Sequence, residues 1–248
     1  MANQKGGVGK TTSVANLGVA LAAMGKRVLL VDLDPQAALT ATFGIDPYNL
    51  SRSVYSLLVS QTTSMARVLR PAGETTMAIA PASVDLAAAD LQLVNEEGRA
   101  FRLREAMEQN RIPFDYIIMD TPPSLGLLTL NGLVAADEVL IPVQCHFLAM
   151  RGVRALMETV WRVKRKLNPG LRLLGLLPTM YEPSSAHSKQ VLDELRQVFT
   201  TKVFDVVIEN NIKFAEAPVV MQSLIEYDPL HEGASAYRKL AEEIAANE

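Results

Sequence analysis

A phosphate-binding loop is encoded close to the start of the chain, in the segment Lys5-Gly-Gly-Val-Gly-Lys-Thr-Thr12. Its glycines allow positive φ angles, which turn successive backbone N–H groups toward a bound anion. The helical pattern that follows adds unpaired N–H groups and the positive end of a helix dipole. In such a loop the Lys10 ammonium reaches the β- and γ-phosphates, and the Thr11 hydroxyl binds Mg²⁺. The spacing therefore predicts a nucleotide site that comprises Lys5, Gly6, Gly7, Val8, Gly9, Lys10, Thr11 and Thr12.

Acidic residues end two of the most apolar segments of the chain. Residues 27–32 read as a buried parallel strand, which stops at Asp32-Leu-Asp-Pro-Gln36. Residues 114–120 stop in the same way at Asp120, ahead of Thr-Pro-Pro-Ser124. An apolar strand that ends in Asp matches the Walker B pattern, whose carboxylate holds Mg²⁺ directly or through water. Because α/β sheets carry their chemistry at the carboxyl ends of the strands, we expect these carboxylates beside the phosphate loop.

The loop departs from the usual P-loop, since Gln4 stands where a glycine is expected and Lys5 is an additional lysine. With Lys5, the segment resembles the deviant Walker A motif of the ParA/MinD group of ATPases. Residues 32–36 and 120–124 are similar to the switch segments of that group. The resemblance implies a homodimer that closes around two ATP molecules with Mg²⁺, each Lys5 touching the nucleotide of the other subunit. It also implies that Asp34 positions the attacking water and acts in catalysis with Lys5 and Lys10, and that Thr11, Asp32 and Asp120 lie at the metal.

A later segment, residues 209–218, resembles a part of the family that lies near the adenine base and the DNA-binding face. Met180 and Asn211 are accordingly expected at the nucleotide. Lys213 stands where relatives have a DNA-contacting arginine. Three other basic residues of the family are missing, because this chain has Glu209-Asn-Asn211, Glu182-Pro-Ser-Ser185 and Gln222 at those places. These losses weaken the expectation of DNA binding and leave the nucleotide site untouched.

A helix is predicted over residues 148–167, with one apolar face and one basic face. The apolar face consists of Val153, Leu156, Met157, Val160, Val163 and Leu167. The basic face consists of Arg151, Arg154, Arg162 and Arg165. A solvated helix surface and a phosphate-binding surface for DNA both explain such a pattern, and the sequence favours neither.

Alternating apolar strands and amphipathic helices run along the whole chain. They predict a single domain, residues 1–248, with a doubly wound, mostly parallel sheet and helices on both faces. The fold is that of a P-loop NTPase of the deviant Walker A type. Further strands are expected at residues 77–81, 138–143, 171–180 and 202–208, and helices at 83–110, 125–136, 187–199 and 233–247. Only residues 1–3 precede Gln4, so the first strand is expected to be truncated, or the native protein to begin upstream of Met1.

Composition narrows the possible functions. The chain has 248 residues, 49% of them apolar, and a net charge of −3, which excludes a protein that coats nucleic acid with its whole surface. Cys145 is the only cysteine, so no internal disulfide can form and an electron carrier of this fold with a cysteine-held iron–sulfur cluster is excluded. No apolar run reaches roughly 18 residues. These features predict a soluble, cytoplasmic protein without membrane contact.

The preferred hypothesis is a ParA/Soj-type partition ATPase, because the resemblance spans nearly the whole chain. As an ATP-bound homodimer it would bind double-stranded DNA without sequence preference, associate with the nucleoid and segregate a DNA or protein cargo. A ParB-like or other small partner would stimulate slow, Mg²⁺-dependent hydrolysis. A MinD-like membrane-cycling ATPase is the alternative, although the acidic end of the chain, residues 241–248, fits it poorly. A metabolic ligase of the same fold also stays open.

Overall fold

The computed structural model describes residues 1–248 except 61, 74–75, 110–112, 147–148, 200–202 and 247–248. Its described strands form a four-stranded sheet with the order β2-β3-β1-β4 and a two-stranded sheet, β5-β6. The neighbouring pairs are parallel, except that β2 runs antiparallel to β3. The strands are β1 (Val28–Asp32), β2 (Arg70–Pro71), β3 (Ala78–Ala80), β4 (Tyr116–Asp120), β5 (Glu138–Gln144) and β6 (Arg172–Thr179).

The first residues of the chain lie between the two sheets. The Thr121 hydroxyl donates to the Met1 carbonyl at 2.9 Å, and the Ala2 N–H donates to the Leu140 carbonyl at 3.2 Å. The Asn3 amide donates to the Pro142 carbonyl at 2.6 Å. Behind these contacts, a cavity of about 640 Å³ separates β4 from β5. The parallel sheet expected from the sequence is therefore present in two parts, connected near the phosphate loop by residues 1–3.

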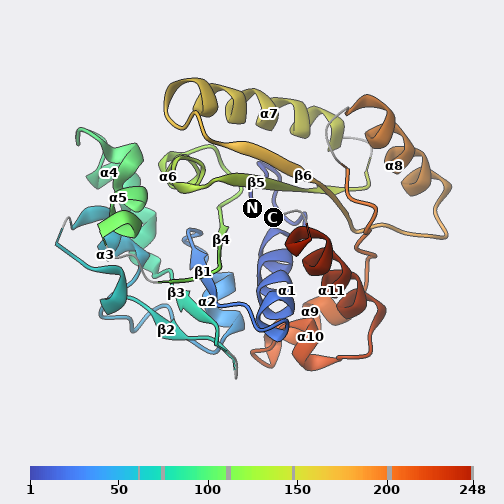
Figure 1. Ribbon diagram of the computed structural model, residues 1–248, viewed down its shortest axis with the longest axis horizontal. Coiled ribbons are helices and arrows are strands. Elements are labelled where there is room, and N and C mark those ends of the chain that lie inside the picture. Colours follow the sequence, from blue (N-terminus) through green and yellow to red (C-terminus); the bar gives the residue numbers. More distant parts are fainter. Residues whose placement is uncertain (61, 74–75, 110–112, 147–148, 200–202, 247–248) are drawn as a thin grey trace.

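Helices cover both faces of the strands (Figure 1). In β1, Val28 and Leu30 join the apolar cluster that contains α1 and α11, whereas Leu29 and Val31 join the cluster that contains α3 and α5. On β5 and β6, the third apolar cluster is completed by α6, α7 and α8. This alternation explains why the strands read as continuous apolar runs. The helices are α1 (Lys10–Ala23), α2 (Ala38–Thr42), α3 (Val54–Val59), α4 (Ala89–Gln92), α5 (Arg102–Gln109), α6 (Leu127–Ala135), α7 (Ala149–Lys166), α8 (Ala186–Val198), α9 (Lys213–Val219), α10 (Leu224–Tyr227) and α11 (Glu232–Ala245), with short 3-10 helices at Met65–Arg67, Val84–Ala88 and Arg99–Phe101.

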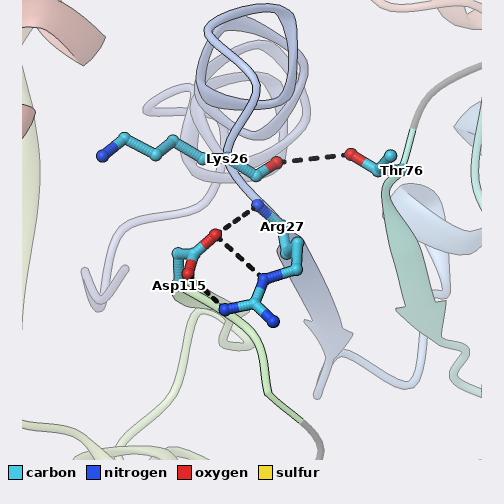
Figure 2. A network of polar contacts seen from close by, with 4 residues as sticks. All are labelled: Lys26, Arg27, Thr76 and Asp115. Carbon is cyan, nitrogen blue, oxygen red and sulfur yellow. Dashed lines mark hydrogen bonds and ion pairs between the residues drawn. The ribbon is translucent and has the colours of Figure 1, made fainter.

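An ion pair aligns β1 with β4 at the end of the sheet opposite the phosphate loop (Figure 2). Asp115 accepts from the Arg27 backbone N–H and guanidinium, with the shortest bonds at 2.7 Å. These bonds lower the pKa of Asp115 to about 2. Because Arg27 and Asp115 each precede a strand by one residue, the pair fixes the register in which Asp32 lies opposite Asp120.

Two expected elements differ in the structure. Residues 203–209 form only isolated bridges, Leu176 with Val203 and Tyr181 with Glu209, instead of the strand predicted at 202–208. The hydrogen bonds of the segment are too widely spaced for a ladder, since the Phe204 and Ile208 N–H groups donate to the Leu176 and Pro178 carbonyls. The one or two helices predicted over 83–110 are divided further, into Val84–Ala88, α4, Arg99–Phe101 and α5, with Gly98 at a φ of 70° before Arg99. Lys202, Asn110, Leu148 and Asn247, which end predicted elements, lie outside the described residues.

Candidate functional site

The phosphate loop turns at Gly7 and Gly9, whose φ angles are 71° and 80°. Side chains are strained at such angles, so the backbone favours glycine at both positions. Gly9 caps α1, and the loop therefore opens directly onto the helix N-terminus. The Thr179 hydroxyl, at the end of β6, donates to the Val8 carbonyl at 2.9 Å. The loop is thus continuous with α1 and is hydrogen-bonded to the end of β6.

Lys10 is buried, with 6% of its surface exposed, and it faces the interior of the loop. Its ammonium donates to the Lys5 carbonyl at 3.3 Å. Burial lowers the pKa of Lys10, and the nearby Asp120 and Asp34 carboxylates oppose this shift. A cation with one long hydrogen bond to a neutral carbonyl is well placed to exchange that bond for a phosphate oxygen.

Asp120 and Thr11 form the part of the site that fits a divalent cation. The Thr11 hydroxyl donates to Asp120 Oδ2 at 2.6 Å, and Asp120 is fully buried. The other carboxylate oxygen, Oδ1, is buried without a hydrogen-bond partner among the described residues. Burial raises the pKa of Asp120 to about 6. An unsatisfied buried carboxylate oxygen is costly, and a hydroxyl and a carboxylate are ligands that Mg²⁺ takes in proteins.

Asp32 lies opposite Asp120 in the sheet, and each of its oxygens accepts at least one hydrogen bond. Oδ1 accepts from the Asp34 N–H at 3.1 Å, and Oδ2 accepts from the Thr40 N–H and hydroxyl at 2.9 and 2.7 Å. The Thr40 hydroxyl in turn accepts from the Ala82 N–H. Burial and the neighbouring Asp120 raise the pKa of Asp32 to about 7. Asp32 therefore fixes the segment after β1, and the metal role expected from the sequence stays a prediction.

Asp34 lies in that fixed segment, two residues beyond the end of β1. Its Oδ1 accepts from the Gln36 N–H at 2.9 Å, and its carbonyl accepts from the Ala37 N–H at 2.8 Å. Ala37 has a φ of 52°, so the backbone turns sharply between β1 and α2. The Asp34 side chain is half-buried and close enough to Lys10 to affect its pKa. The structure brings this carboxylate to the phosphate loop.

The two residues expected at the adenine base lie on neighbouring segments. Met180 directly follows β6, with a φ of 50°. The next residue, Tyr181, bridges to Glu209, and its carbonyl accepts from the Asn210 N–H at 2.9 Å. Asn211 follows at once and is exposed. The bridge between Tyr181 and Glu209 thus joins the segment of Met180 to the segment of Asn211, and Met180 directly follows Thr179, which contacts the loop.

The basic face predicted on α7 is exposed, and the apolar face is confirmed as core. Val153, Leu156, Val160 and Val163 are buried, with Met157 and Leu167 packed against them. Within the described part of the chain, Arg151, Arg154, Arg162 and Arg165 form no ion pair.

Trp161, which sequence reasoning passed over, is 53% exposed on the same helix. The Lys164 ammonium lies 5.9 Å from the centre of its ring. The helical pattern could have predicted this exposed position, because the tryptophan falls outside the predicted apolar face.

Lys213 is apart from the α7 arginines, at the start of α9. Its ammonium is paired with the Asp228 carboxylate, which raises the pKa of Lys213. Its charge is partly compensated by Asp228, whereas no ion pair in the described ranges compensates the charges of the α7 arginines.

Among the described residues, no helix combines the length and the apolar character needed to cross a membrane.

Known proteins resemble this chain in sequence and in structure. The family model described as an AAA domain matches residues 1–173. The sporulation initiation inhibitor protein Soj of Bacillus subtilis is 43% identical over 99% of this chain and 96% of its own length. The chromosome partitioning protein ParA of Myxococcus xanthus is 41% identical over 98% of this chain and 86% of its own length.

A solved structure agrees with these relatives. A Mycobacterium smegmatis protein named cobyrinic acid a,c-diamide synthase, crystallised with ADP and magnesium, is 40% identical, with a TM-score of 0.86. The similarity covers 98% of this chain and 91% of that protein's chain. The chain belongs to the ParA and Soj family of P-loop ATPases.

Proposed function

We propose that residues 1–248 form one ATPase domain that dimerises around ATP and Mg²⁺ and, in that state, binds DNA to segregate a cargo. The observation that carries the proposal is the unsatisfied Asp120 oxygen beside Thr11, at the mouth of a glycine loop that contains a buried lysine. The carboxylate and hydroxyl oxygens fit a coordinated cation, and the lysine and loop N–H groups fit hydrogen bonds to an anion; a Mg²⁺-nucleotide supplies both.

Each residue of the site has a role in this proposal. Thr11 and Asp120 hold Mg²⁺, which neutralises developing charge on the transferred phosphoryl group. Lys10 and the loop N–H groups bind the β- and γ-phosphates. Asp34 positions the attacking water, and Asp32 holds the segment that carries Asp34. Met180 and Asn211 line the site of the adenine base. Adenine is preferred over guanine because the sequence lacks the guanine motif Asn-Lys-x-Asp.

Dimer formation explains the additional lysine. Lys5 is exposed at the edge of the loop, where it can reach a second copy of the chain. The α7 arginines occur twice in such a dimer, so the basic surface doubles only when ATP joins the subunits. The name of the Myxococcus relative, chromosome partitioning protein ParA, supports a chromosomal cargo. With that cargo we propose a ParB-like stimulating partner and nucleoid localisation.

Two other activities predict different behaviour. An amide synthase, as the Mycobacterium smegmatis protein is named, would be expected to couple ATP turnover to an acid substrate and an amine donor. Turnover of ATP by the isolated chain would favour a partition ATPase. A MinD-like membrane cycle needs a basic amphipathic surface helix, and α11 carries Glu232, Glu242 and Glu243 beside Arg238 and Lys239.

Sedimentation velocity with Mg²⁺ tests the proposal. We expect the chain to be monomeric with ADP and dimeric with the slowly hydrolysed analogue ATPγS. Lys5→Ala should stay monomeric with both, while Lys189→Ala, an exposed lysine on α8, should behave as the wild type. A wild-type chain that is monomeric with ATPγS would contradict the proposal.

A further inference from the structure

The carboxyl ends of β5 and β6 meet the phosphate loop through two polar side chains in matched register. Gln144 and Thr179 are the last residues of the two strands and pair with each other. Thr179 donates to the Val8 carbonyl. Gln144 Oε1 accepts from the Lys5 ammonium at 2.7 Å. One rung of the sheet therefore contacts both the backbone of the loop and its additional lysine.

Residues 2–5 follow one edge of β5. Ala2 donates to the Leu140 carbonyl and Asn3 to the Pro142 carbonyl, so the contacts fall on alternate residues of the strand. Gln144 continues this series by two residues, and its side chain takes the place of a backbone acceptor. The Lys5 N–H donates to Asn3 Oδ1 at 3.0 Å. The ammonium of Lys5 is thus directed to β5 of its own subunit, and its backbone N–H to Asn3, which itself contacts β5.

We propose that Gln144 is a positioning residue that holds the Lys5 ammonium within its own subunit until ATP brings a second copy of the chain. The inference rests on the proposed function, in which Lys5 contacts the nucleotide of the partner. To do so, the ammonium exchanges a neutral amide oxygen for a phosphate oxygen of opposite charge. Charge-assisted bonds are the stronger kind, so the exchange is favourable once the partner's nucleotide is present.

The chemistry of Gln144 suits such an exchange. Lys5 is exposed, which keeps the bond in water and makes it modest. A carboxylate at position 144 would form an ion pair with Lys5 and compete with the phosphate. A side chain of similar length without an acceptor would leave Lys5 free. The two changes therefore act on dimer formation in opposite directions.

The experiment compares Gln144→Met and Gln144→Glu by sedimentation velocity with Mg²⁺ and ATPγS. Loss of one modest hydrogen bond corresponds to about threefold per subunit. Because two such contacts open per dimer, we expect Gln144→Met to lower the dimer dissociation constant about tenfold. Gln144→Glu should raise it by at least as much. Gln197→Met and Gln197→Glu, on the exposed surface of α8, are the matched controls and should leave it unchanged.

Binding of fluorescent ADP to the monomers, together with circular dichroism melting, checks that the Gln144 variants fold and keep the loop. Opposite shifts of the two variants support the proposal, since a structural defect would weaken the dimer in both. Equal shifts, or none, in a chain whose wild type dimerises would overturn the role of Gln144 alone. A wild-type chain that stays monomeric with ATPγS would overturn the proposed function and this inference together.

Discussion

At the scale of single residues, the site depends on three carboxylates that differ in how many hydrogen bonds they accept. Asp32 has donors on both oxygens, Asp120 has Thr11 on one, and Asp34 accepts from Gln36 on one while remaining half-buried. A carboxylate with donors on both oxygens is suited to structure, and one with an empty buried oxygen is suited to a cation. The same side-chain type thus has different proposed roles within one site.

Asp120→Asn removes the charge at the proposed metal position with little change of shape. The amide can still accept from Thr11, but it is a poor Mg²⁺ ligand, so we expect ATP binding to lose its dependence on Mg²⁺. Calorimetric titration of ATP with Mg²⁺ and with EDTA measures this. The wild type should bind more tightly with Mg²⁺, while the variant should show equal affinities. A variant that retains the Mg²⁺ effect would place the metal elsewhere.

Asp34→Ala should bind ATP normally but turn it over at least about 100-fold more slowly, because the water loses its orientation while the phosphate loop is intact. Phosphate release at saturating ATP gives the rate, and calorimetry gives the affinity. Asp193→Ala, an exposed residue of α8, is the matched control. Unchanged turnover in Asp34→Ala would assign the positioning of water to another residue.

At the scale of secondary structure, the loop is supported by elements far from it in sequence. Gln144 ends β5 and Thr179 ends β6, and each contacts a different part of the loop. The Arg27–Asp115 ion pair at the other end of the sheet supports the register of β1 and β4. In this register Asp32 lies opposite Asp120. The geometry of the site is in this sense a property of strand alignment.

Thr179→Val tests the support given by β6. Valine has nearly the same shape but no hydroxyl, so the Val8 carbonyl loses its donor at a position that is 1% exposed. We expect a loss of about 1 kcal/mol in the free energy of unfolding. ATP affinity should also fall several-fold, measured by calorimetry. Thr179→Ser keeps the hydroxyl and should bind ATP nearly as the wild type does. Equal weakening by both variants would point to packing of the methyl group instead.

At the scale of the whole molecule, net charge and local charge have opposite signs. The chain as a whole carries −3, while α7 presents exposed arginines on one surface that form no ion pair with any residue the structure describes. Such a surface attracts a polyanion weakly in one copy and more strongly in two, because each neutralised phosphate releases counterions. A dimer controlled by ATP would therefore control DNA affinity without any change within α7.

Duplex DNA should bind to the chain with ATPγS and Mg²⁺ but not with ADP, and the affinity should fall steeply with salt. Arg162→Glu removes the basic residue next to Trp161 in both subunits, and we expect about tenfold weaker binding with a shallower salt dependence. Gel shifts measure the affinity. Trp161 is the only tryptophan, so quenching of its fluorescence reports binding at α7 directly.

Arg67→Glu, an exposed arginine on a short helix, is the matched control for this change of charge. It should bind DNA as the wild type does and still form the ATPγS dimer. Equal DNA binding with ATPγS, ADP and no nucleotide, or none at low salt, would mean that the basic face of α7 is only solvated.

The sequence by itself determined the features that depend on local pattern. The glycine loop, the apolar strands that end in Asp32 and Asp120, and the two faces of α7 follow from spacing of a few residues, and the structure confirms each. Helices on both faces followed from the alternation of elements along the chain, because each amphipathic helix needs a sheet to cover.

The tertiary structure decided what depends on residues that are distant in sequence. Asp32 accepts a hydrogen bond from Thr40, Lys213 forms an ion pair with Asp228, and Lys5 donates a hydrogen bond to Gln144. No local sequence pattern predicts these partners, because each bond forms only when separate elements are brought together by folding. The strand predicted at 202–208 was wrong for a similar reason. An apolar segment can be buried in the core without the backbone spacing that a ladder of hydrogen bonds requires.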